Sequence, residues 1–171
     1  AGYPIGSVHP HLAGLDLTIP FSNGSASIDK GDGEPVVIVS ALPHGESAAT
    51  LREWIVAAEV AGKKAVVVDL AADSRLNDAT DFEKTYGKEH GAPELADTFH
   101  CGLPELKDDG ETPLVVSHPG CFTTATTLAA APLVASGLVH EDITAFAVTG
   151  STGSGRSPTL TTHLSLIHIS E

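Results

Sequence analysis

Cys121 has the strongest setting for covalent chemistry in this sequence. It follows a predicted strand and the pair Pro119-Gly120, at a point where a helix is predicted to begin. A helix N-terminus presents free N–H groups and a partial positive charge, which favour the nucleophilic thiolate over the thiol. The same amides can stabilise an oxyanion when the thiolate attacks a carbonyl carbon. The sequence therefore predicts nucleophilic catalysis, with a buried structural cysteine as the alternative.

The other candidate residues have weaker settings. Cys101 is not followed by a predicted helix and is expected to be structural. His9 and His11 have no cysteine or carboxylate at a metal-binding spacing, so no metal site is predicted. Residues 150–155 contain Gly-x-x-Gly-x-Gly without the strand-to-helix context of a dinucleotide fingerprint. Arg156, which follows, can bind a phosphate or a carboxylate, with a flexible surface turn as the alternative.

A predicted α/β arrangement positions these residues. Buried β-branched runs predict strands of a parallel sheet that is covered on both faces, over residues 36–39, 65–70 and 114–116. Helices are predicted over residues 46–61, 78–86 and 121–133 or 135. The first strand, helix and second strand form a right-handed βαβ unit. A weak strand is predicted over Leu15 to Pro20, and Ile143 to Thr149 is predicted to begin a different sheet.

Three loops are expected to meet at one edge of the sheet. In an open parallel sheet, ligands bind outside the carboxyl ends of the strands. Those ends are followed here by residues 40–45, 69–75 and 117–121. Ordinary strand-to-helix connections are the alternative, in which Asp73 and Arg75 simply pair with each other.

The composition excludes several classes of protein. The 171 residues include 22 acidic and 9 basic side chains, for a net charge of −13, which argues against a nucleic-acid or anionic-membrane binder. With 42% hydrophobic residues the chain can bury a core, and no stretch reaches the length of a membrane span. Two cysteines do not make a disulfide framework, so a cytoplasmic location is expected.

Seven segments in chain order point to one family. They are residues 8–14, 41–47, 69–76, 86–90, 102–106, 118–122 and 150–156. Together they resemble N-acetyl-gamma-glutamyl-phosphate reductase, an arginine-biosynthesis enzyme of the semialdehyde dehydrogenase superfamily. His118 departs from the asparagine that the family usually has in its Asn-Pro-Gly-Cys signature.

The resemblance implies a Rossmann-like, doubly wound parallel sheet that is truncated at its N-terminus, followed by the start of an α+β catalytic and dimerisation domain. The family's first strand and its Gly-x-x-Gly-x-x-Gly turn would precede Ala1. The expected domains are a partial NADP-binding domain at residues 1–136 and the start of the second domain at 137–163. Residues 164–171 resemble translated adapter sequence, with a real apolar strand as the alternative.

The resemblance also implies NADPH-dependent reductive dephosphorylation of N-acetyl-gamma-glutamyl phosphate to its semialdehyde, through a thioester on Cys121. The general-base histidine would lie beyond the last residue, and the truncated chain is expected to be inactive in the full reaction on its own. The implied NADP contacts are Ser40, Ala41, Leu42, Pro43, His44, Gly45, Pro119 and Gly120. The implied contacts to the small acyl-phosphate substrate are Arg75, His118, Ser151 and Arg156. The full-length parent is expected to be a homo-oligomer.

Several functional alternatives stay open. Within the class, the alternatives are a lysine-pathway amino-carrier reductase and an aspartate-semialdehyde dehydrogenase. From other classes come a non-catalytic fragment, which would lack both the dinucleotide turn and the base, and a cysteine-dependent hydrolase. The fragment hypothesis predicts that the chain alone neither binds NADPH tightly nor turns over substrate.

Overall fold

The computed structural model describes part of the chain. The described residues are 3–4, 14, 18–19, 28, 33–106, 110, 113–139, 142–150 and 153. The chain divides into two compact units, Ala1–Cys121 and Phe122–Glu171. The domain boundary at residue 137 stays a prediction.

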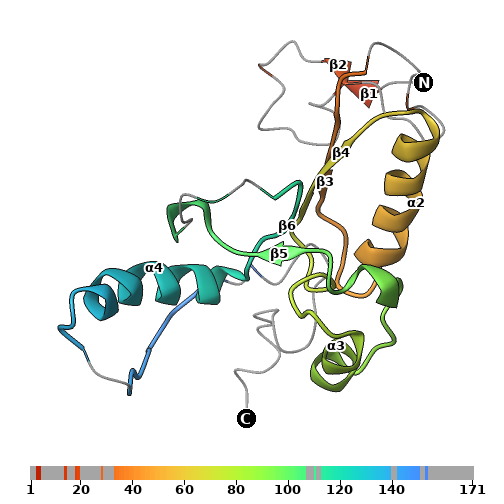
Figure 1. Cartoon of the computed structure of the whole chain (residues 1–171). Coiled ribbons are helices and arrows are strands. Elements are labelled where there is room, and N and C mark those ends of the chain that lie inside the picture. Colours follow the sequence, from red (N-terminus) through yellow and green to blue (C-terminus); the bar gives the residue numbers. More distant parts are fainter. Residues whose placement is uncertain are drawn as a thin grey trace. The chain divides into compact units, whose positions relative to one another are not determined.

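A four-stranded parallel sheet forms the centre of the first unit (Figure 1). Its strands are β3 (Val36–Ser40), β4 (Ala65–Asp69), β6 (Val115–Ser117) and β5 (His100–Cys101), in that spatial order. Each neighbouring pair is parallel. This arrangement confirms an α/β, Rossmann-like fold, because the β-branched runs form parallel strands joined by crossovers. A separate antiparallel pair joins β1 (Tyr3–Pro4) and β2 (Thr18–Ile19), so the weak strand predicted there is confirmed in a shorter form.

Helix α2 (Ser47–Val60) is the crossover between β3 and β4. It packs along these two strands and buries Leu51 in a core with Val67 and Phe99 (Figure 1). Gly62, at φ 73°, adopts the left-handed conformation just after the helix, as expected of a glycine stop. The predicted βαβ unit is therefore confirmed.

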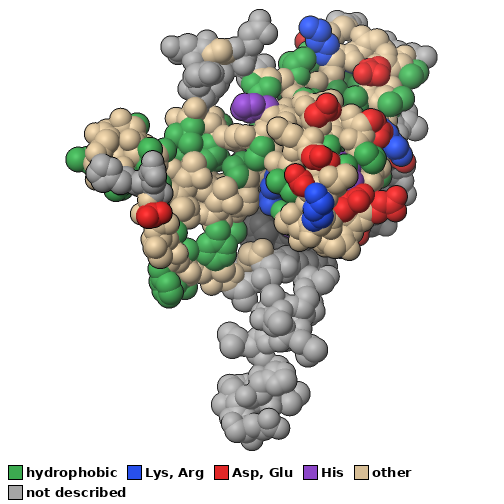
Figure 2. Space-filling view, turned by 60° about the horizontal axis from the view of Figure 1, so that its bottom comes forward, with side chains coloured by type: hydrophobic (Ala, Val, Ile, Leu, Met, Phe, Trp, Pro, Cys, Tyr) green, Lys and Arg blue, Asp and Glu red, His purple; other side chains and the backbone are tan. Residues whose placement is uncertain are grey.

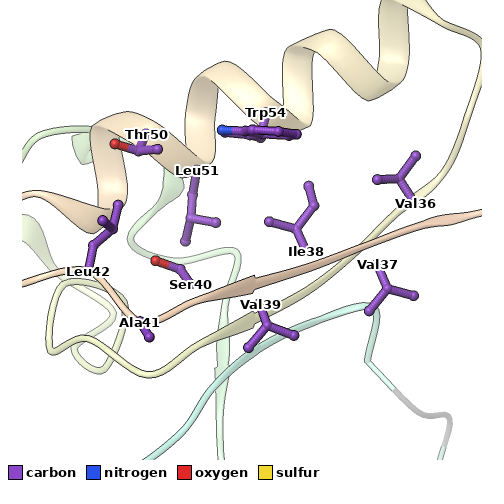
Figure 3. Close-up of a pocket in the computed structure, with 10 residues that line it drawn as sticks. All are labelled: Val36, Val37, Ile38, Val39, Ser40, Ala41, Leu42, Thr50, Leu51 and Trp54. Carbon is purple, nitrogen blue, oxygen red and sulfur yellow. The ribbon is translucent and has the colours of Figure 1, made fainter. Parts of the chain in front are cut away.

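The expectation that β3 is buried on both faces is wrong. Its burial alternates, and Val37 and Val39 are 67% and 62% exposed. Figure 3 shows Ile38 on the side of α2, with Val37 and Val39 on the opposite side of the strand. Within the described part of the first unit, α2 covers only one face of this strand.

The connection from β4 to β6 contains helix α3 (Ala79–Tyr86), the short helices η3 (Pro93–Leu95) and η4 (Pro104–Leu106), and β5. Asp78 caps α3 by accepting a hydrogen bond from the Thr80 N–H, and Gly87 ends the helix at φ 65°. These two residues are the start and stop signals that define a short helix.

Helix α4 (Cys121–Ala135) begins at the last residue of the first unit and continues in the second, and Gly137 follows it at φ 69°. Residues 143–149, predicted as a strand, form no strand. In the described part of the chain no neighbouring strand pairs with them, and Phe146 and Val148 are 97% and 89% exposed. No helix among the described residues has the length and apolarity that crossing a bilayer requires.

Candidate functional site

The carboxyl ends of three strands meet in one register row. Ser40 of β3 pairs with Asp69 of β4, which pairs with Ser117 of β6. All three residues are buried. The three loops that follow these strands therefore start from one edge of the sheet, as the strand pattern predicted.

Asp69 ties the first two strand ends to helix α2. Its Oδ1 accepts hydrogen bonds from Ser47 Oγ at 2.7 Å and from the Ala71 N–H at 3.0 Å, and its Oδ2 accepts one from Ser74 Oγ at 2.9 Å. Ser47 Oγ also lies 2.6 Å from Ser40 Oγ. The fully buried carboxylate thus has three donors, which compensate for the loss of water around it.

Asp73 closes the N-terminus of α2. Its carboxylate accepts hydrogen bonds from the Gly45 N–H at 2.8 Å and from the Ala48 N–H at 3.1 Å. These amides belong to the helix start, where an anion is favourable. The alternative that Asp73 simply pairs with Arg75 is wrong. The Asp73 carboxylate instead accepts from the amides at the start of α2, and Arg75 donates to backbone carbonyls.

The loop after β3 is held in a fixed conformation by two contacts to His44. The Ala72 N–H donates to His44 Nδ1 at 3.0 Å, so the proton of this ring lies on Nε2. Lys88 Nζ donates to the His44 carbonyl at 2.8 Å. The neighbouring Gly45 has φ 90°, and an added Cβ would lie 2.8 Å from Lys88 Cδ. Only glycine fits at this position without a shift of its neighbours.

The buried side chain of His90 connects the loop after β4 to the segment at Ala92. Its buried ring accepts a hydrogen bond from the Ala92 N–H at Nδ1, so Nε2 carries the proton and donates to the Asp73 carbonyl at 2.9 Å. Both ring nitrogens are used within the protein. His90 therefore has a structural role in this arrangement.

Arg75 links the loop after β4 to the loop that leads to Cys121. Its Nε donates to the His118 carbonyl at 2.9 Å, and its Nη2 donates to the Leu70 carbonyl at 2.9 Å. A Cβ added to Gly120 would lie 3.3 Å from Arg75 Nη1. The His118 ring donates from Nδ1 to the Pro119 carbonyl at 2.7 Å. The segment before the cysteine is thus held through its backbone carbonyls.

Cys121 is exposed and is the first residue of α4. The alternative of a buried structural cysteine therefore does not describe it. Cys101 is also an exposed free thiol, at the end of β5. Its predicted structural role gains no support from burial.

Two pockets border these loops. An apolar pocket of about 520 Å³ lies along β3 and α2, and Figure 3 shows Leu51 and Trp54 of the helix facing Ile38 of the strand. Its remaining lining residues are Val36, Val37, Val39, Ser40, Ala41, Leu42 and Thr50. A polar pocket of about 510 Å³ lies between the loop after β4 and the end of β5, and it is bordered by Arg75 and Cys101.

Four predicted residues lie outside the described part of the chain: Ser151, Arg156, His9 and His11. Of the glycine-rich loop the structure describes Gly150 and Gly153, which are joined by a hydrogen bond of 3.2 Å from the Gly153 N–H. The assigned roles of the site residues stay predictions.

Sequence reasoning missed the residues that hold the loops in place. Asp69, Ser47 and Lys88 had no predicted role, although each makes a hydrogen bond across loops. A usable signal existed for Asp69, because an acidic residue that ends a run of three valines must find donors when the run is buried. Lys88 carries no such signal, since its contact depends on how a distant loop folds.

Comparison with known proteins gives a consistent result. The family described as semialdehyde dehydrogenase, dimerisation domain, matches residues 121–170. N-acetyl-gamma-glutamyl-phosphate reductase from Acidothermus cellulolyticus is 40% identical over 161 residues, which cover 92% of this chain and 42% of that protein. The enzyme of this name from Methanothrix thermoacetophila is 40% identical over 164 residues, covering 95% and 44%.

A relative with a different printed name is similar to nearly the same degree. A putative [LysW]-L-2-aminoadipate/[LysW]-L-glutamate phosphate reductase from Aeropyrum pernix is 39% identical over 145 residues, which cover 84% of this chain and 38% of that protein. The chain spans less than half the length of the curated relatives that it matches.

Proposed function

The chain belongs to the semialdehyde dehydrogenase family and is a homologue of its N-acetyl-gamma-glutamyl-phosphate reductases. We propose on this basis that it functions in the NADPH-dependent reductive dephosphorylation of N-acetyl-gamma-glutamyl phosphate. The observation that carries this proposal is the position of Cys121, an exposed thiol at the first residue of a helix. The helix start favours the thiolate and offers N–H groups to a developing oxyanion.

In the proposed first step, Cys121 Sγ attacks the carbonyl carbon of the acyl phosphate. A carbon–sulfur bond forms, the carbon–oxygen bond to the phosphate breaks, and inorganic phosphate leaves with the electron pair. The acyl group remains on Cys121 as a thioester. The substrate contacts proposed for this step are Arg75, His118, Ser151 and Arg156.

The loop after β3 is suited to the uncharged part of NADPH rather than to its pyrophosphate. The amides of Gly45 and Ala48 already bind the Asp73 carboxylate, so a phosphate placed there would lie against a negative charge. Ser40 and Leu42 instead border an apolar pocket. When bound, NADPH supplies the hydride that reduces the acyl group. The proposed contacts are Ser40, Ala41, Leu42, Pro43, His44, Gly45, Pro119 and Gly120.

The first step can be tested on the chain itself, without NADPH. We expect N-acetyl-gamma-glutamyl phosphate to release inorganic phosphate faster than in buffer and to leave an acyl adduct on the Cys121 peptide, detected by mass spectrometry. Cys121→Ser should abolish both signals, and Cys101→Ser, the matched control, should leave both unchanged. Phosphate release that survives in Cys121→Ser would show that the proposed nucleophile is wrong.

The substrate can be assigned by the same assay. The relative from Aeropyrum pernix favours an amino-carrier substrate as a second candidate, because its identity to this chain is 39% against 40%. We expect N-acetyl-gamma-glutamyl phosphate to acylate Cys121 faster than a carrier-linked acyl phosphate or aspartyl phosphate. A faster reaction with either of these two would replace the proposed substrate and keep the reaction class.

A further inference from the structure

We propose that Arg75 is a positioning residue that fixes the turn carrying Cys121. The inference rests on the proposed function only for the identity of Cys121 as the nucleophile. It concerns the backbone of residues 118–120, where the Arg75 side chain, from the loop after β4, donates to the His118 carbonyl and lies close to Gly120. Through this turn the guanidinium sets where the thiol stands relative to the sheet edge.

The two hydrogen bonds of Arg75 connect two different strand ends. Leu70 follows β4 and His118 follows β6, and their carbonyls accept from Nη2 and Nε at 2.9 Å each. A planar guanidinium can direct these two donors at once, whereas a lysine ammonium is a single centre on a flexible stem. The bridge therefore fixes the position of the His118 carbonyl relative to the Leu70 carbonyl, in addition to placing a positive charge there.

Gly120 shows how closely the guanidinium approaches the turn. Its φ does not lie in the left-handed region, so its backbone conformation does not require glycine. An added Cβ would, however, lie 3.3 Å from Arg75 Nη1 and 3.9 Å from Arg75 Cζ. Gly120, which directly precedes Cys121, therefore leaves space for the Arg75 side chain because it has no Cβ. The guanidinium therefore lies near the turn at Gly120 as well as at the His118 carbonyl.

This role differs from the substrate contact proposed above. The bridge uses Nε and Nη2 on backbone carbonyls, and it exists in the protein without any ligand. Its effect should therefore appear in the reactivity of the Cys121 thiol when neither substrate nor cofactor is present.

The test measures alkylation of Cys121 by iodoacetamide in a Cys101→Ser background, so that one thiol reacts. The rate of the folded chain is divided by the rate of the same chain unfolded in urea. We expect Arg75→Lys and Arg75→Gln to lower this ratio several-fold and to similar extents, because neither side chain can bridge both carbonyls. Arg52→Lys is the control, since Arg52 makes only an exposed ion pair with Glu94, and it should leave the ratio unchanged.

A second variant reports on the same bridge without altering Arg75. Gly120→Ala should also lower the ratio, because its Cβ would lie 3.3 Å from Arg75 Nη1 and would require the guanidinium to shift by a few tenths of an ångström. Circular dichroism shows which variants keep the fold, and Gly120→Ala decides the question if the Arg75 variants unfold.

Two results would overturn the proposal. One is a ratio that Arg75→Lys preserves and Arg75→Gln lowers, which would mean that charge alone matters. The other is a ratio that Gly120→Ala leaves unchanged. Failure of the acyl-phosphate assay would instead contradict the proposed function, because alkylation needs neither substrate nor cofactor.

Discussion

The Asp73 carboxylate occupies the position that a ligand anion takes at the N-terminus of many helices. It binds the N–H groups of Gly45 and Ala48 and is fully buried. A helix N-terminus that follows a parallel strand is a common place for a ligand phosphate. Here the protein supplies the negative charge itself, and the loop before α2 takes its shape from that contact.

Removing the Asp73 carboxylate should therefore destabilise the chain strongly. Asp73→Ala leaves two amides without their acceptor, and we expect the free energy of unfolding to fall by about 3 kcal/mol in urea denaturation. Asp97→Ala, at an exposed position, is the control and should change it by less than about 0.5 kcal/mol. Equal effects of the two substitutions would mean that the contact at the helix start contributes little.

Ser117 presents the opposite case. Its buried Oγ has no hydrogen-bond partner among the described residues. A buried hydroxyl without a partner keeps its cost of desolvation, so Ser117→Ala should raise the free energy of unfolding by about 1 kcal/mol. Ser47→Ala is the matched control and should lower it, because Ser47 Oγ bonds to both Ser40 and Asp69. A loss of stability in Ser117→Ala as large as that in Ser47→Ala would refute this prediction.

Helix α3 shows how a charged capping residue makes the stability of a helix depend on pH. The side-chain hydroxyl of Thr80, and then its backbone N–H, donate to Asp78 and lower the pKa of that carboxyl below its ordinary value. The contribution of the charged cap is therefore complete above the unfolded pKa of about 3.9. It is lost as the pH falls through the lower pKa of the folded state.

Asp78→Asn removes this titration and keeps a capping side chain. We expect wild type to be more stable than the variant at pH 7, and this difference to shrink as the pH is lowered from 5 to about 2.5. Urea unfolding of both proteins across that range measures the difference. A difference that stays constant with pH would contradict the assigned cause.

The elements were predicted well where one stretch of sequence determines them. The valine runs gave β3 and β4, and Asp78 and Gly87 mark the two ends of α3. Residues 143–149 have a strand-like pattern but form no strand, because a strand needs a neighbour and the described chain provides none.

The candidate site was predicted only in part, for the same physical reason. The helix start at Cys121 is visible from local sequence. The carbonyl partners of Arg75 and the amide partners of Asp73 lie 5 to 43 residues away along the chain. Such contacts depend on how three strand ends meet, and no local pattern encodes them.

The net charge of the chain and its exposed apolar surface have opposite effects on association between chains. The net charge of −13 favours mutual repulsion between chains, and Figure 2 shows most of the acidic side chains in view gathered on the right-hand part of the face, with hydrophobic side chains among them. Among the described residues β3 is an edge strand, with Val37 and Val39 exposed. An exposed apolar edge strand can pair with another chain.

The balance between these two effects predicts association that depends on salt. We expect the chain to self-associate as its concentration and the ionic strength rise, because screening weakens the repulsion but leaves the edge strand available. Val37→Lys should reduce this association in sedimentation velocity, since a lysine on an edge strand opposes pairing. Val56→Lys adds the same charge at an exposed position of α2 and is the control. If both variants reduce association equally, then added charge is the cause and β3 is not the surface through which the chains associate.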